Sequence, residues 1–198
     1  MRRATAVSLA LTVAVAPVTF DDVGPGHPFA TEVAWGAGAG VVSGYDDGGF
    51  RPGAAVSRQA LAALLYRYTG TDWQPPEGWQ GLRDVGPDHP FRTEIAWAIG
   101  VGALPAYQDG TFRGAGEVSR PEVAAILHTM AGAPAVSEGS QTLPFSDVFE
   151  ESDLVVPITW VSLHGIAHGY PDGTFGVTAS VSRQAAVAFL HRFDTAND

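Results

Sequence analysis

Three arginines stand at matched positions in three similar stretches of the sequence. The stretches read VSRQALAALL, VSRPEVAAIL and VSRQAAVAFL, and their arginines are Arg58, Arg120 and Arg183. A cation just inside the start of a helix opposes the helix macrodipole, so its repetition needs a reason. Anion binding would supply one, because a helix N-terminus offers unpaired N–H groups and a planar guanidinium can hold a carboxylate through two hydrogen bonds.

Two roles for these arginines are open at this point. In the first, each arginine fronts a groove that binds an acidic sugar or sugar substituent. In the second, each pairs with an acidic neighbour, for instance Asp47, Asp109 or Asp172, and only pins a loop. For Arg183 the pinning role is favoured, because the third stretch belongs to a part of the chain that has lost several recurring side chains.

The arginines belong to a unit that occurs three times, at offsets of 62 and 63 residues and without internal gaps. Aligned on Trp35, Trp97 and Trp160, the unit repeats an Asp-Val pair, a Gly, a Tyr, an Asp-Gly turn, a Phe and the Val-Ser-Arg triplet. Such self-similarity indicates a repeat architecture. The repeats are assigned to residues 20–69, 82–131 and 145–193.

Each repeat predicts a helix, a loop and a second helix. The first helix of the chain should run from about Phe29 to Ala39 and end at Gly40, which can take a left-handed conformation. The second helices open at a serine that can cap them, and Glu122 completes a capping box in the second copy. Their apolar residues recur at i, i+3, i+4 and i+7, so they need a partner surface. We expect an all-α fold in which the second helices pack on one another around a pseudo-threefold axis.

The loops between the helices carry GYDDGGF, AYQDGTF and GYPDGTF, in which Asp-Gly supplies a tight turn. Their tyrosines could stack on a sugar, but their regular place points first to packing beneath the loop, with the hydroxyl at a groove. Calcium is not expected, because each loop offers only one or two carboxylates. The candidate ligand-binding residues of the loops are Tyr45, Asp47, Gly48, Tyr107, Asp109 and Gly110.

The chain resembles the S-layer homology family, because the Asp-Gly turn, the capping serine and the helix-start arginine recur together at the same spacing. The shared frame is F-x-D-V, then G-Y-x-D-G-T-F, then a Val-Ser-Arg triplet that opens an Ala/Leu-rich helix. The resemblance implies a three-pronged helical spindle that anchors exported proteins to a secondary cell-wall polysaccharide without a covalent bond. It also implies that the arginine of a Thr-Arg-Ala-Glu-like motif contributes to an anionic-sugar site between prongs.

The sequence departs from the family pattern in several places. Only the second copy keeps the glutamate of that motif, and His27 and His89 precede Pro-Phe where the family often has Trp. We expect these histidines to cap the first helices, with ligand contact as the alternative. The third copy has Ser152, Pro157 and Gly176 where the others have His, Glu and Arg, which points to a structural role for it.

Composition narrows the possible partners. The formal net charge is −10, with 21 acidic and 11 basic residues, which argues against nucleic acid. There is no cysteine, and no nucleophile elbow, phosphate loop or dinucleotide fingerprint occurs, so neither an enzyme nor a cofactor is expected. His164 and His168 are spaced as a helical metal pair, but the other copies lack them, and a metal site is not expected.

The N-terminus resembles a secretory signal peptide over residues 1–16, with Arg2 and Arg3 before a short apolar run. That run is too short to span a bilayer, and no later segment resembles a membrane span. Trp73 and Trp79, in the first connector, are expected to cover an apolar face. The sequence therefore predicts an exported, non-catalytic module at the cell wall that binds an anionic glycopolymer. The alternative is a surface-array or envelope scaffold that associates with itself or with other proteins.

Overall fold

The computed structural model of the chain describes residues 19–136, 145–149 and 152–197. Within these ranges the secondary structure consists of helices, and the only β pairing is isolated bridges, so the all-α prediction is confirmed. None of these helices is both long enough and apolar enough to cross a membrane. The predicted signal peptide, residues 1–16, lies outside the described residues. The helices are α1 (Ala30–Gly38), α2 (Arg58–Thr69), α3 (Arg92–Gly100), α4 (Arg120–Met130), α5 (Val155–Leu163) and α6 (Arg183–Asn197).

Helices α2 and α4 start at the serines that the sequence predicted as their caps. The Ser57 hydroxyl accepts the backbone N–H of Ala60 at 3.3 Å at the start of α2. At the start of α4, Ser119 and Glu122 form the full capping box. After α1, Gly40 has a φ of 72°, the left-handed conformation that ends the helix.

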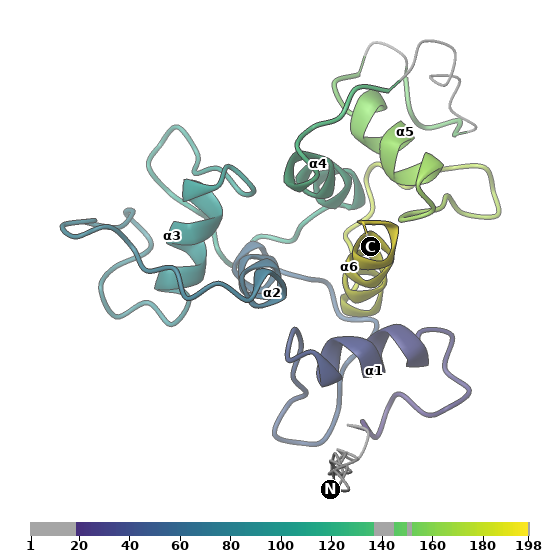
Figure 1. Cartoon of the computed structure of the whole chain (residues 1–198), viewed down its shortest axis with the longest axis horizontal. Coiled ribbons are helices and arrows are strands. Elements are labelled where there is room, and N and C mark those ends of the chain that lie inside the picture. Colours follow the sequence, from purple (N-terminus) through teal and green to yellow (C-terminus); the bar gives the residue numbers. More distant parts are fainter. Residues whose placement is uncertain (1–18, 137–144, 150–151, 198) are drawn as a thin grey trace, which may run out of the picture.

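The helices pair across repeats rather than within them. The first helix of each repeat packs on the second helix of the preceding repeat, so α3 lies on α2, α5 on α4, and α1 on α6. Figure 1 shows three lobes, with α2, α4 and α6 around the centre and α1, α3 and α5 outside them. The predicted three-pronged arrangement is confirmed, and the pairing of α1 with α6 brings the first and last repeats together.

The expectation that the second helices bury their stripes mainly on one another is wrong. Their main partners are the outer helices, each of which supplies a tryptophan. In every lobe, an aromatic ring of the second helix contacts that tryptophan. The tryptophan gives the outer helix a large apolar surface for this packing. The ring pairs are Tyr66 with Trp97 (5.7 Å between centroids), His128 with Trp160 (5.6 Å) and His191 with Trp35 (4.9 Å).

The pseudo-threefold axis is held by a ring of backbone hydrogen bonds just before the second helices. Val56 donates its N–H to the carbonyl of Val181 at 2.9 Å, and Val118 donates to Val56 at 3.0 Å. Val181 donates to Val118 at 2.8 Å and closes the ring. All three side chains are buried, so these bonds are shielded from water and tie the repeats together at the centre.

The first connector covers the α2–α3 lobe, as predicted for its tryptophans. Trp73 and Trp79 are partly buried against the core. The Tyr66 hydroxyl on α2 donates to the Trp73 carbonyl at 2.8 Å, and the guanidinium of Arg92 on α3 lies 4.4 Å from the Trp79 ring centroid. Both tryptophans therefore complete the packing of this lobe.

Candidate functional site: two grooves between the repeats

Each helix-start arginine reaches across into the loop of the following repeat. Arg58 donates from Nε to the Phe112 carbonyl at 3.0 Å and from Nη2 to the Pro105 carbonyl at 2.8 Å. Arg58 and Arg120 are buried, whereas Arg183 is half-buried. The other two arginines make the same pair of bonds. Arg120 donates to the carbonyls of Phe175 (2.9 Å) and His168 (2.7 Å), and Arg183 donates to those of Phe50 (2.8 Å) and Ser43 (3.0 Å).

These arginines do pin loops, but not through the acidic partners that the sequence suggested. Asp47 pairs with Arg51 and Asp109 with Arg113, each at 2.9 Å, so both carboxylates are taken by arginines of their own loops. The third loop has Gly176 at the equivalent place, and Asp172 accepts hydrogen bonds from Thr174 instead. The predicted Asp pairing is therefore wrong: backbone carbonyls hold the helix-start arginines, and the acidic neighbour of Arg58 is Glu122, at 3.9 Å, rather than an aspartate.

The expectation of unpaired N–H groups at the helix starts is also wrong. At the start of α2, Arg58 donates its backbone N–H to Gly116 at 2.8 Å and Gln59 donates to Gly114 at 3.0 Å. The next two N–H groups bond to the hydroxyl and carbonyl of Ser57. In α6 the first two N–H groups bond to carbonyls of the first repeat. Sequence alone did not show that the following repeat would occupy these donors.

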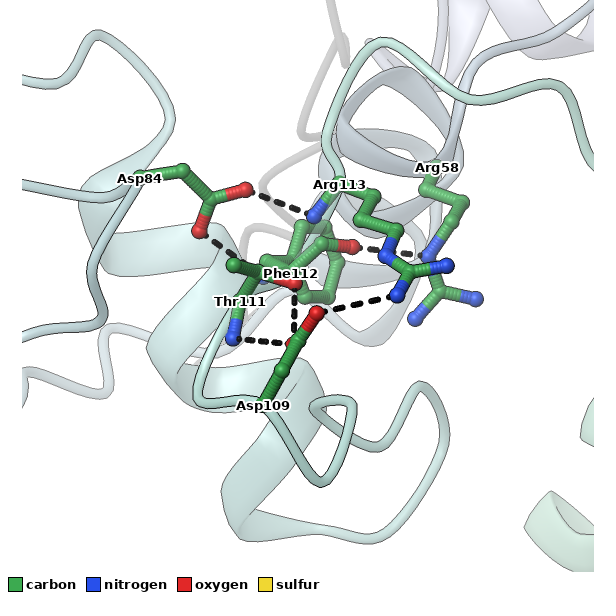
Figure 2. A network of polar contacts seen from close by, with 6 residues as sticks. All are labelled: Arg58, Asp84, Asp109, Thr111, Phe112 and Arg113. Carbon is green, nitrogen blue, oxygen red and sulfur yellow. Dashed lines mark hydrogen bonds and ion pairs between the residues drawn. The ribbon is translucent and has the colours of Figure 1, made fainter.

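A clamp aspartate, which the sequence showed only as a recurring residue, shapes each loop. The Asp84 carboxylate accepts the backbone N–H groups of Phe112 at 2.8 Å and Arg113 at 2.7 Å (Figure 2). Asp22 and Asp147 hold the other loops in the same way. The N–H donors from the loop lower the pKa of Asp22. The clamp fixes the loop backbone before any ligand arrives.

The Asp-Gly pairs form the turn itself. Asp109 accepts the N–H of Thr111 at 3.0 Å and its hydroxyl at 2.6 Å, beside the ion pair with Arg113 (Figure 2). The Thr111 hydroxyl, followed by Arg113, lowers the pKa of Asp109 to about 2. Gly48 and Gly110 have φ values of 82° and 77°, which a glycine adopts without strain. None of the four predicted Asp and Gly residues lines either of the grooves described next.

The tyrosines do reach the grooves. Tyr45 and Tyr107 are 40% and 38% exposed, so the expectation of buried rings is wrong for them, while Phe50 and Phe112 beneath the loop are fully buried. Each tyrosine ring lies between two guanidinium groups. These are Arg51 (3.8 Å from the ring centroid) and Arg183 (5.0 Å) at Tyr45, and Arg113 (3.9 Å) and Arg58 (5.0 Å) at Tyr107.

Two grooves of the same construction combine an arginine of one repeat with the loop and second helix of the next. The Arg58 groove, about 360 Å³, is lined by the loop from Gly102 to Tyr107 and by Glu122 and Thr129 of α4. The Arg183 groove, about 230 Å³, is equivalent to it. Its lining includes Val42, Ser43, Gly44, Tyr45, Ala60, Arg67, Phe91 and Arg183. Glu122 and Arg67 were not among the predicted site residues.

The third arginine has different surroundings. The Arg120 guanidinium lies 5.1 Å from the ring of Phe189, which stands where α4 has Ile126. Burial lowers the pKa of Arg120. Because each arginine reaches into the following repeat, the loop arginine that Gly176 replaces is missing beside Arg120. Assigning this loss to Arg183 was therefore wrong.

The histidines have structural partners. His27 Nδ1 accepts the N–H of Phe29, and His89 Nδ1 that of Phe91, each at 3.2 Å. The prediction that they cap the first helices is wrong, because the N-cap residues are Phe29 and Phe91, without a side-chain cap bond. Because α5 ends at Leu163, His164 and His168 do not share a helix face. Within the described ranges, no group of three or more His, Asp or Glu residues could hold a metal ion.

Comparison with known proteins agrees with this construction. The family model of the S-layer homology domain matches residues 19–62, 82–124 and 144–187. Cell surface glycoprotein 1 of Acetivibrio thermocellus is 27% identical over 160 residues, which cover 75% of this chain and 7% of that protein. The chain thus spans only a small part of the curated relative. S-layer homology modules are a non-catalytic family of the cell surface, and they bind cell-wall polymers in general. Three tandem matches that together span more than half of the sequence show that this chain belongs to the S-layer homology domain family and is a cell-surface anchoring module.

Proposed function

We propose that the chain anchors to the cell wall by binding an anionic secondary glycopolymer in the Arg58 and Arg183 grooves, and that it acts in export-dependent surface attachment rather than catalysis. The observation that carries this proposal is the shared construction of the two grooves. Each presents a half-exposed tyrosine next to a guanidinium that a loop already holds in place. The exposed part of the tyrosine, with its hydroxyl, suits contact with a sugar, and a fixed cation suits an acidic substituent of the same polymer.

The guanidiniums keep donors for a ligand although they also hold loops. An arginine has five N–H donors, and Arg183 uses its Nε and Nη2 on carbonyls. No hydrogen bond to Nη1 of Arg183 occurs in the described part of the chain, and this atom belongs to a residue that lines the groove. The loop bonds therefore preorganise the cation, which lowers the entropy cost of binding.

A second function is supported by a different surface. Phe149, Val156 and Leu163 of the third repeat are exposed, with Phe149 at 72%. The first and second repeats have Gly, Thr and Gly at these three positions. Exposed apolar side chains at positions that are glycine or threonine in the other two repeats suit a protein partner or a second copy. We retain protein–protein assembly as the alternative function on this ground.

A wall-binding assay tests the proposal. The full chain is mixed with purified wall sacculi, before and after chemical removal of the non-peptidoglycan glycopolymer. We expect retention on native sacculi and its loss on stripped ones. The double variant Tyr45→Ala/Tyr107→Ala should lower retention at least about tenfold, because it removes the half-exposed tyrosine side chain from both grooves while leaving the backbone turns intact.

The matched control is Phe149→Ala, which removes an exposed aromatic ring outside both grooves. Its retention should equal that of the unchanged protein. Equal retention on stripped and native sacculi would overturn the proposal. Concentration-dependent self-association that Phe149→Ala abolishes, without wall binding, would favour the alternative function.

A further inference from the structure

The two grooves share their construction but not their charge. Position 60 in the Arg183 groove is alanine, and its equivalent in the Arg58 groove is Glu122. Position 67 is arginine, and its equivalent is Thr129. The Arg183 groove is therefore lined by two cations and no carboxylate, whereas the Arg58 groove is lined by one cation and one carboxylate.

In the Arg58 groove, Glu122 already occupies the place of an acidic ligand. Its Oε2 is fixed by the backbone N–H of Ser119 at 2.7 Å and by the Ser119 hydroxyl at 2.8 Å. Its Oε1 lies 3.9 Å from Nη1 of Arg58, the terminal nitrogen that does not hold the loop. An incoming carboxylate would meet a cation that is already paired and a negative charge that the helix cap keeps in position.

Among the described residues that line the Arg183 groove, no carboxylate stands beside the positive charges. Arg67 on α2 is exposed and makes no ion pair with any residue in the described ranges. Burial is the main cause that lowers the pKa of Arg183. The charges of Arg51 and Arg67 also lower it, whereas Tyr45 and Asp22 raise it. Arg183 and Arg67 line the same groove, and an anion bound between them would offset the repulsion between their charges.

We propose that the two grooves sort sugars by charge: the Arg183 groove takes the carboxylate-bearing residue of the wall glycopolymer, and the Arg58 groove takes a neutral one. Arg67 and Nη1 of Arg183 are the two donors to the carboxylate, since the Nε and Nη2 donors of Arg183 already hold the loop. Glu122 is the residue that excludes the carboxylate from the other groove. This inference rests on the proposed function and adds to it which groove reads the charge.

The experiment compares two forms of one probe. The wall glycopolymer is purified in its native form and after reduction of its carboxylates to alcohols, and its affinity for the full chain is measured by calorimetry. Arg67→Thr installs the residue that the other groove carries, at an exposed position that does not hold the fold. It should weaken binding of the native polymer about fivefold and leave binding of the reduced polymer unchanged.

The reciprocal variant acts on the other groove. Glu122→Gln removes the charge but keeps a side chain that can complete the capping box. Combined with Thr129→Arg, it should tighten binding of the native polymer about fivefold, because it gives the Arg58 groove the charges of its counterpart. Circular dichroism and thermal melting of each variant confirm that the helices are retained.

The outcomes separate this inference from the proposed function. If the unchanged chain binds the native polymer but Arg67→Thr binds it equally well, the charge-sorting inference is wrong and the wall-binding function stands. If the unchanged chain binds neither form, the proposed function itself fails. Loss of binding after removal of phosphodiesters, with no effect of carboxyl reduction, would show that the anion is a phosphate and overturn the assignment to a carboxylate.

Discussion

The loop of the second repeat, held by Arg58, and the loop of the third repeat, held by Arg120, have the same skeleton and different surfaces. In both, a buried arginine donates to two loop carbonyls and a clamp aspartate accepts two successive N–H groups. On the surface, the second loop has Arg113 where the third has Gly176.

The comparison explains why the arginines repeat. A backbone contact that both loops share holds the fold, and a side chain found in only one can distinguish the ligands of the grooves. The pair of carbonyl bonds is shared by all three loops, so the helix-start arginine is first a structural residue. The charges at positions such as Glu122 and Arg67 differ between repeats, and these residues distinguish the grooves.

The largest effect should follow from removing a shared contact. We expect Arg120→Ala to lower the free energy of unfolding by about 3 kcal/mol, because two loop carbonyls lose their donors and the Phe175 and Phe189 rings lose a packing partner. Urea denaturation followed by circular dichroism measures the change. Arg67→Ala, an exposed arginine outside this network, is the control and should shift stability by less than about 0.5 kcal/mol. Equal stability of Arg120→Ala and the unchanged chain would mean that the arginine is not structural.

Sequence reasoning succeeded where the relevant contacts are local. The helix starts at Ser57 and Ser119, the Asp-Gly turns and the threefold repeat all follow from residues a few positions apart or from direct alignment. It failed where a partner lies in the following repeat. The carbonyl partners of Arg58 are about fifty positions away, and a carbonyl leaves no mark in the sequence because every residue has one.

Sequence reasoning was limited in the same way for the grooves, because their lining comes from different repeats. The roles of Glu122 and Arg67 depend on which loop faces each second helix, and periodicity within one repeat cannot show this. The exchange of partners between repeats also reversed the expectation for the third copy. Gly176, which replaces the loop arginine, lies in the loop that Arg120 holds and not in the one that Arg183 holds.

A smaller effect should appear in acid and differ between the two loops. The pKa of Asp109 is lowered from its ordinary value to about 2, first by the Thr111 hydroxyl and then by Arg113. Hydrogen bonds from Thr174 lower the pKa of Asp172, which has no equivalent arginine. A lowered folded-state pKa contributes stability that is present above the unfolded pKa and is lost as pH falls through the folded pKa. The urea concentration at the unfolding midpoint should therefore decrease as the pH is lowered from about 4 to about 2.

The two aspartates can be separated by matched variants. Asp109→Asn keeps a side chain that supports the turn but no longer titrates. It should reduce the loss of stability in acid more than Asp172→Asn does, because only Asp109 also pairs with an arginine. If both variants flatten the curve equally, the loop arginine contributes nothing to the acid sensitivity.

The smallest effect concerns the position at which the two loops differ. Arg113 has a φ of 54°, a strained value for a residue with a Cβ, and Gly176 has a φ of 83° at the equivalent place. Arg113→Gly relieves this strain and removes an exposed ion pair, so its melting temperature should stay within about 2 °C of the unchanged chain. The reverse change is not equivalent, because a Cβ at Gly176 would lie 2.6 Å from a ring carbon of Tyr170. Gly176→Ala should therefore lower the melting temperature by about 4 °C in calorimetry, since it combines backbone strain with displacement of the ring. Equal shifts for the two variants would show that the third loop tolerates the side chain that the second one carries, and that its glycine is not required by the position of Tyr170.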